Sequence, residues 1–313
     1  MPALASKIDE PAGHRDLAEH ALMDGRVDEA VRMLQAELSA DGNNGRIHLL
    51  LCRAYYSETQ VDPAVQECAS ALLTLSNSSE AQDWMGRAYG VKANNSGPIS
   101  GFKLARKVHD AFEAAFALDP HSVAAANDLG EYYASAPAVV GGGLDKADAL
   151  ANKVEAELPQ AAHRIRAMAA EKRKDYGTAE REFQAAVDVA HRPDAWVDLG
   201  GFYARRNQKD RAVTAFKRCI AADRAKDASI VDVASYLIDM QVEPGLALQE
   251  LRQYLAGDAK SDAAPAVRVH VLMSKLLLNG GDSSGSKIEV EKALQLAADY
   301  PPAKSALLTY RGH

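Results

Sequence analysis

Apolar and small residues recur along the chain at fixed spacings. The fullest example is Trp196-x2-Leu199-Gly200-x2-Tyr203, which is followed by Ala212-x3-Phe216. The first half of this pattern returns at Met85-Gly86-x2-Tyr89 and at Leu129-Gly130-x2-Tyr133. Each full pattern is typical of two helices joined by a turn, in a unit of about 34 residues.

The same interval links residues over most of the chain. Ala179 stands one unit before Ala212, and Ala30 stands one unit before Ala64. Leu51 is followed by Met85 at the same interval. A period this regular predicts a repeat array in which each unit packs on its neighbours.

The residue types in the pattern have a packing reason. A small residue follows the apolar one in each first helix and lets the second helix come close, as at Cys52, Gly86, Gly130, Ala167 and Gly200. Alanines at the matching place of the second helix offer a similarly small surface. Large residues such as Phe112, Phe183 and Phe216 then fill the space between units.

Stepping outward from the best unit divides the chain into eight units. Their predicted bounds are 11–44, 45–78, 79–122, 123–159, 160–192, 193–227, 228–264 and 265–300. Residues 1–10 are expected to be a tail. After Pro301-Pro302, a short helix over 303–310 is expected to cover the open end of the last unit, within a capping segment 301–313.

Two units exceed the regular length. Ten extra residues fall in 91–101, and five fall in 135–144. Insertions in repeat arrays map to loops, often on a binding face. The second one carries Val139 and Val140 before three glycines, and apolar loop residues either tuck into a groove or contact a partner.

These motifs resemble those of the tetratricopeptide-repeat family over residues 11–300. The loop around Val139 is similar in outline to one in uncharacterised bacterial tetratricopeptide proteins. The resemblance implies an all-α, right-handed solenoid of about eight helical hairpins with a C-terminal capping helix. It also implies that the first helices line a concave groove for an extended peptide or a helix.

By this resemblance, the groove side chains are Arg53, Asp83, Arg87, Asn127, Glu131, Arg164 and Tyr236. The Lys pairs with which some members clamp a C-terminal carboxylate are missing here. The mixed charge fits an interior peptide segment better. We expect the partner to bind along units 79–192, with the loop 136–144 and its Val139 and Val140 extending the site.

The composition and charge of the chain argue against some classes of function. The 313 residues carry 36 basic and 43 acidic side chains, a net charge of −7, which makes nucleic acid an unfavourable partner. No run of about 18 apolar residues predicts a membrane span. The first residues do not form a secretory signal, so a cytoplasmic location is expected, or a periplasmic one if the true N-terminus is longer.

Catalytic and metal-binding patterns are missing from the sequence. Nine histidines are scattered without metal-ligand spacing, and His48, His163 and His270 stand where Trp196 stands in the best unit, which indicates packing. Gly141-Gly142-Gly143 lacks the rest of a phosphate-binding motif. We therefore expect no enzyme activity, no cofactor, no bound metal and no small-molecule substrate.

Two of the three cysteines, Cys52 and Cys68, are expected to face each other within one hairpin. They could be two buried thiols or a disulfide, and the disulfide would imply an oxidising compartment. The missing secretory signal favours buried, reduced thiols within disulfide reach.

Three functions remain open. The first is a protein–protein interaction scaffold or adaptor. The second is a structural component of a bacterial envelope or secretion assembly, which needs export. The third is a non-catalytic subunit of an enzyme complex.

Overall fold

Every regular element of the described chain is helical. The structure is a computed structural model that describes residues 14–40 and 42–309. Those residues contain seventeen α-helices and one short 3-10 helix, and no strand. The predicted all-α solenoid is confirmed.

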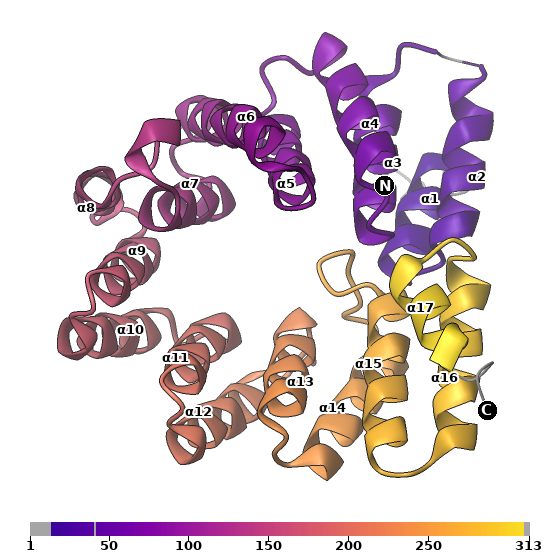
Figure 1. The fold of residues 1–313 in the computed structure, drawn as a ribbon. Helices are drawn as coiled ribbons and strands as arrows, with labels where there is room; N and C mark the ends of the chain where they lie inside the picture. Colours follow the sequence, from indigo (N-terminus) through magenta and orange to yellow (C-terminus); the bar gives the residue numbers. More distant parts are fainter. Residues whose placement is uncertain (1–13, 41, 310–313) are drawn as a thin grey trace, which may run out of the picture.

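The helices form two concentric rows around the middle of the molecule (Figure 1). The inner row is α1 (His14–Met23), α3 (Gly45–Ser57), α5 (Ser79–Asn94), α7 (Val123–Ser135), α9 (Pro159–Lys172), α11 (Pro193–Arg205), α13 (Ala228–Met240) and α15 (Ala266–Asn279). The outer row is α2 (Val27–Leu38), α4 (Val61–Thr74), α6 (Pro98–Leu118), α8 (Leu144–Val154), α10 (Tyr176–Ala190), α12 (Lys209–Ala222), α14 (Pro244–Ala256) and α16 (Ser283–Leu296). A last helix, α17 (Pro301–Thr309), follows α16.

Small residues mark the closest approaches between helices. A Cβ atom added to Gly200 of α11 would lie 2.3 Å from Cε1 of Phe216 on α12. The same construction at Gly86 of α5 reaches Cε1 of Phe112 on α6 at 2.4 Å. These glycines therefore let an aromatic ring of the outer helix lie directly on the inner helix, as the sequence pattern predicts.

The array closes on itself into a ring. Figure 1 shows the first and the last helices side by side, and their buried apolar residues form one cluster. The N-terminal units contribute Leu22, Val27, Ala30 and Ala54, and the C-terminal units contribute Val267, Val290, Ala293, Ala297, Tyr300 and Ala303. We call this contact the seam. Because ends that would otherwise meet water are buried against each other, neither needs a polar cap.

Two polar contacts also join the two ends of the array at the seam. The backbone N–H of Ala298 donates to Asp28 Oδ2 at 2.8 Å, across 270 residues of sequence. Toward the middle of the ring, Arg53 Nε donates to Asp262 Oδ2 at 2.7 Å, and both side chains are 9% exposed. An ion pair this deeply buried needs good geometry to offset its desolvation.

The helix that follows α16 has a different role from the expected cap. It packs on α16 and α15, and Ala303 belongs to the seam cluster, so it helps to join the two ends of the array. It does not cover an open end, since the first unit already lies there. The expected tail 1–10 lies outside the described residues, as does residue 310 of the expected capping helix.

The first insertion lengthens a hairpin, and the predicted loop over 91–101 is wrong. Helix α5 continues to Asn94, and α6 begins at Pro98, so only Asn95, Ser96 and Gly97 connect them. Proline fits the first turn of a helix because its missing N–H has no partner there in any case. The extra residues therefore extend both helices beyond the rest of the array.

A disulfide links the two helices of the second unit. It joins Cys52 of α3 to Cys68 of α4, with Cα atoms 5.1 Å apart. The predicted proximity is confirmed, whereas the structure has a disulfide in place of the expected pair of thiols. Cys219 is a buried free thiol.

Three carboxylates gather where α3 ends against the seam. Glu58 is 2% exposed, and its Oε1 has no hydrogen-bond partner among the described residues. Burial, together with the nearby charges of Asp28 and then Asp299, raises the pKa of Glu58 to about 7. Since this pKa lies above the unfolded value, the group favours the folded state at low pH and loses this contribution as the pH rises from about 4.5 to 7.

Replacing Gly200 by Leu should strongly destabilise the protein, because the new side chain must displace the buried ring of Phe216. We expect a loss of about 1–3 kcal/mol or more in the free energy of unfolding. Gly245→Leu is the matched control, since nothing lies within 4 Å of a Cβ at that position. Equal denaturation midpoints for the two variants would contradict the packing described here.

The seam can be tested at Gly25, whose φ is +77° and whose added Cβ would lie 2.6 Å from Cβ of Ala266. Gly281 has a similar φ of +87° with nothing within 4 Å. Both changes to Ala carry the backbone strain of about 1–2 kcal/mol. Only Gly25→Ala should also push the two ends of the array apart at the seam. It should therefore lose more stability and show a larger radius of gyration in small-angle scattering. An identical effect of both changes would argue against ring closure.

Glu58→Gln should make the protein more stable at pH 8 and change it little at pH 5, because the amide resembles the protonated carboxyl group. The expected gain at pH 8 is about 1–3 kcal/mol. Chemical denaturation at both pH values measures it, with the exposed Glu291→Gln as control. A gain of the same size at both pH values would show that charge is not the cause.

Candidate functional site

The inner wall of the ring carries a ladder of ion pairs between successive units. Arg46 Nη1 lies 3.0 Å from Glu80 Oε2, and Arg164 Nε lies 2.9 Å from Asp198 Oδ2, each pair being 34 residues apart. Arg205 binds Glu171 over the same separation, at 2.8 and 2.9 Å. One repeat length separates the partners because they occupy equivalent places on adjacent inner helices.

The structure brings most of the predicted groove residues into this ladder. Arg87 pairs with Asp83 at 2.9 Å and with Asp128 at 2.7 Å. Arg164 pairs with Glu131 at 3.0 Å as well as with Asp198. Each arginine thus bridges two carboxylates, so these charges stabilise the wall itself and are less free for a partner than the sequence indicated.

The other three predicted residues have different surroundings. Arg53 is 8% exposed and held at the seam by Asp262. The Oδ1 atom of Asn127 is buried and has no hydrogen-bond partner within residues 14–40 and 42–309. Tyr236 stacks on Phe216 with ring centroids 5.3 Å apart and lines the inner wall.

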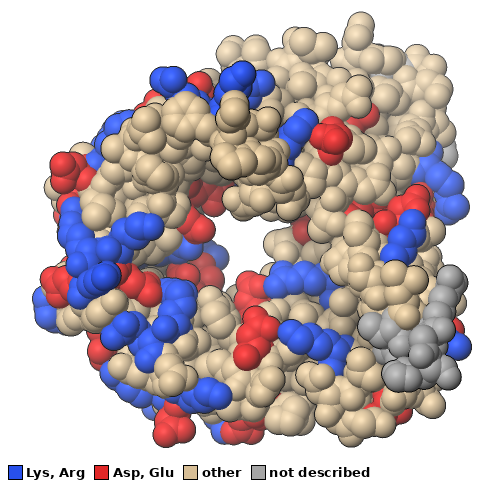
Figure 2. Space-filling view, viewed as in Figure 1, with Lys and Arg blue, Asp and Glu red and all other residues tan. Residues whose placement is uncertain are grey.

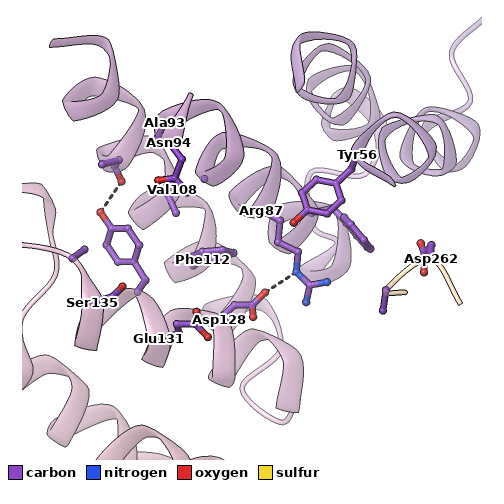
Figure 3. Close-up of a pocket in the computed structure, with 16 residues that line it drawn as sticks. Tyr56, Arg87, Ala93, Asn94, Val108, Phe112, Asp128, Glu131, Ser135 and Asp262 are labelled. Atoms are coloured by element: carbon purple, nitrogen blue, oxygen red, sulfur yellow. Dashed lines mark hydrogen bonds and ion pairs between the residues drawn. The ribbon is translucent and has the colours of Figure 1, made fainter. Parts of the chain in front are cut away.

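A cavity of about 600 Å³ opens on the inner wall between α3, α5, α6 and α7 (Figure 3). We call it the first cavity. Four aromatic rings line it, and its charged lining residues are one arginine and three carboxylates: Tyr56, Trp84, Phe112, Tyr132, Arg87, Asp128, Glu131 and Asp262. The extended part of the α5–α6 hairpin also lines it through Ala93 and Asn94.

Trp84 stands at the centre of a group of rings and cations. The guanidinium carbon of Arg87 lies 4.9 Å from the centre of its ring, and that of Arg53 lies 5.6 Å away. Tyr56 meets Trp84 edge to face at 5.4 Å. The indole therefore already stabilises two cations through its π-system, which fixes their positions.

Two acids compete for Arg87 beside the first cavity. Asp83 is 5% exposed, and its Oδ1 has no hydrogen-bond partner in the part of the chain that the structure describes. Burial and the charge of Asp128 raise the pKa of Asp83 to about 7, against the opposing effect of Arg87. Negative charge at this place is therefore incompletely neutralised by the protein's own side chains.

A loop over 257–265 brings Asp262 and Ala263 to the first cavity from the far end of the chain. Tyr254 of α14 is fully buried and holds the loop. Its hydroxyl oxygen accepts from the N–H of Ser261 at 2.9 Å and donates to the carbonyl of Ala264 at 2.7 Å. Figure 3 shows Asp262 on this separate segment, beside the other residues that line the cavity.

A second cavity of about 630 Å³ adjoins the first, and Glu131 and Ser135 line both. Its lining includes the two ladder pairs Arg164–Asp198 and Arg205–Glu171. Three further cations, Lys172, Lys174 and Arg206, also line it and have no carboxylate partner among the described residues. The second cavity is therefore basic where the first is acidic.

The loop that was expected to extend the site folds back on its own helices. Val139 is 67% exposed, but Val140 is only 6% exposed, so the expectation that both valines extend the binding site is wrong for Val140. The hydroxyl of Tyr132 lies 2.8 Å from the carbonyl of Val140 and 2.7 Å from that of Ala105. A Cβ atom at Gly142 would lie 2.0 Å from the carbonyl oxygen of Ala136, which explains the glycine there.

The recurring histidines pack within their units, as predicted, and they also bind a carboxylate. His48 Nδ1 lies 2.6 Å from Glu67 Oε2, His163 lies 2.7 Å from Glu182, and His270 lies 2.6 Å from Glu289. The partners are 19 residues apart in each case, on the inner and outer helix of one unit. These histidines therefore tie the two helices of a hairpin together.

No group of three or more His, Cys, Asp or Glu side chains in 14–40 and 42–309 is placed to hold a metal ion. No helix in that part of the chain is long and apolar enough to cross a membrane.

Several residues that line the first cavity were not predicted from the sequence. Trp84 directly precedes the Met85-Gly86 motif and could have been found from its place beside Asp83 and Arg87. Asp128 could have been found in the same way, next to Asn127. Asp262 carries no local signal, because it reaches the cavity only through ring closure.

Comparison with known proteins identifies the repeats. Two tetratricopeptide-repeat family models match the chain, one over residues 21–88 and the other over residues 193–226. No curated protein sequence matches it significantly.

Among solved structures, yeast Tom70 is similar with a TM-score of 0.53 and 14% identity, covering 99% of this chain and 68% of Tom70. The Thermus thermophilus tetratricopeptide protein TTC0263 has a TM-score of 0.49 and 15% identity, with 72% of this chain and 97% of that protein covered. With the helical pairs, the regular repeat period and both family models in agreement, this chain is a tetratricopeptide-repeat protein.

Proposed function

We propose that this protein is a non-enzymatic scaffold or adaptor that binds an extended segment of a partner protein on the inner wall of its ring. Tetratricopeptide arrays are generally non-catalytic modules for protein–protein interaction, with an extended concave binding surface. The observation that carries the proposal is the pair of adjoining cavities on that surface, lined by aromatic rings and polar side chains.

Ring closure favours an extended partner segment over a folded one. Figure 2 shows an opening through the middle of the molecule, with acidic and basic side chains along its edge. A partner reaches the cavities only through this opening, since the seam joins the ends of the array. An extended segment also gains from preformed pockets, because the wall loses little conformational entropy on binding.

The ladder determines which variants can test this proposal. Reversing the charge of Arg87 or Arg164 would break two ion pairs each and disturb the wall. Ser135 is a better position, because it is exposed, lines both cavities, and its side chain makes no hydrogen bond in the described structure.

Ser135→Trp should block the junction of the two cavities and weaken partner binding at least about tenfold, an effect of about 1.4 kcal/mol. The partner is first captured from cells and identified by mass spectrometry, and its affinity is then measured by titration. The control is Ser284→Trp, at an exposed position on the outer helix α16. Equal affinities for both variants would place the binding surface outside the inner wall.

A structural role in an envelope or secretion assembly, or a role as a non-catalytic enzyme subunit, is compatible with the same surface. In either case the partner identified by capture would be a component of that assembly or enzyme. The inner-wall proposal applies equally to these roles, because it concerns how the partner binds.

A further inference from the structure

The two cavities carry opposite charge and adjoin each other. The charged lining of the first consists of Arg87, Asp128, Glu131 and Asp262. The second is lined by the ladder ion pairs and by the three cations Lys172, Lys174 and Arg206. A partner segment that lies along the wall must therefore carry, one after the other, charges complementary to the first and to the second cavity.

In and around the first cavity, carboxylates outnumber arginines. Four arginines and seven carboxylates form three separate groups of ion pairs there. Arg46 and Arg53 bind Glu19, Glu80 and Asp262, Arg87 binds Asp83 and Asp128, and Arg164 binds Glu131 and Asp198. The carboxylate of Asp83 is incompletely neutralised as a result, since its buried Oδ1 has no hydrogen-bond partner among the described residues. A cation entering this cavity would therefore relieve repulsion that is already present.

The shape of the first cavity suits a long basic side chain. Tyr56, Phe112 and Tyr132 offer apolar ring surface to the methylene stem of a lysine or arginine, while Asp128 and Glu131 stand at the wall to receive its charged end (Figure 3). Such side chains bury their stems along apolar surface and keep the charge on polar groups. A phosphate or a carboxylate would meet uncompensated negative charge here.

The free cations of the second cavity favour an acidic side chain there. The guanidinium carbon of Arg206 lies 3.5 Å from the ring centre of Tyr176, which fixes it at the wall. Lys172 donates to the carbonyl of Ser135 at 3.3 Å, at the junction of the two cavities. Because the ladder already pairs Arg164 and Arg205 with carboxylates, these three cations remain to bind a carboxylate of the partner.

Building on the proposed inner-wall function, we propose that the partner is an extended peptide segment with a basic residue in the first cavity and an acidic residue in the second. The distance between the cavities sets the spacing. Adjacent helices lie about 8–10 Å apart, and an extended chain advances about 3.3 Å per residue. With one or two helix spacings between the pockets, the basic and acidic residues are separated by about three to six positions.

The test uses peptides selected on the intact protein. A displayed library of random dodecapeptides is panned on the full chain, and the enriched peptides are sequenced and synthesised. We expect enriched peptides to carry Lys or Arg about three to six positions from Asp or Glu. Affinities are measured by fluorescence polarisation at low and high salt, since the charged contacts should weaken at high salt.

Two sets of variants locate each end of the peptide. Asp128→Asn leaves Asp83 as a partner for Arg87, so the wall is expected to fold. It should weaken the selected peptide about tenfold and have little effect on a peptide whose basic residue is changed to Gln, as in a double-mutant cycle. Lys172→Gln with Lys174→Gln should act in the same way on the acidic residue. The controls are the outer-face changes Glu155→Gln and Lys287→Gln.

The outcomes separate this proposal from the one on which it rests. Enriched peptides without a basic residue, or affinities unaffected by Asp128→Asn, would overturn the charge assignment even where Ser135→Trp still abolishes binding. No enrichment at all, or binding unaffected by Ser135→Trp, would overturn the inner-wall function as well.

Discussion

The contact between the first and the last units is the constraint on which the rest of the molecule depends. In an open repeat array each unit touches only its neighbours, and the two ends need solvated faces. Here the ends are neighbours too, through the cluster around Val27, Val290 and Tyr300. The rotations between successive units must therefore add up to a full turn. A change in the rotation of any one unit would alter how the two ends meet at the seam.

Closure also determines what the inner wall can be. It brings Asp262, near the end of the array, to Arg53, near its beginning, and so completes the first cavity from two distant parts of the chain. The ion-pair ladder holds the intervening helices in register, with partners one repeat length apart. The wall is therefore a preorganised surface on which most of the charged side chains are paired with one another.

Local features of the fold were predictable from the sequence, whereas features that accumulate over many units were not. Gly200 and Phe216 identify a hairpin because both lie within a single repeat unit. Ring closure depends on small rotations summed over the array, and no short motif encodes it. The first insertion was recognised from the spacing of the repeat motifs but assigned to a loop, because insertions in repeat arrays usually map to loops. In the structure Pro98 opens α6, a position that proline favours.

Helix α3 connects the disulfide, the seam and the first cavity. Four of its residues face different neighbours, because successive residues of a helix are rotated by about 100°. Cys52 is bonded to α4, Arg53 binds Asp262, Ala54 packs in the seam, and Tyr56 lines the cavity. A disulfide that fixes α3 against α4 therefore also fixes the position of one side of the seam. Since Arg53 and Tyr56 both contact Trp84, the same helix sets the geometry of the rings that line the first cavity. The stability of the ring and the shape of the first cavity thus depend on the same few residues, and neither can change independently of the other.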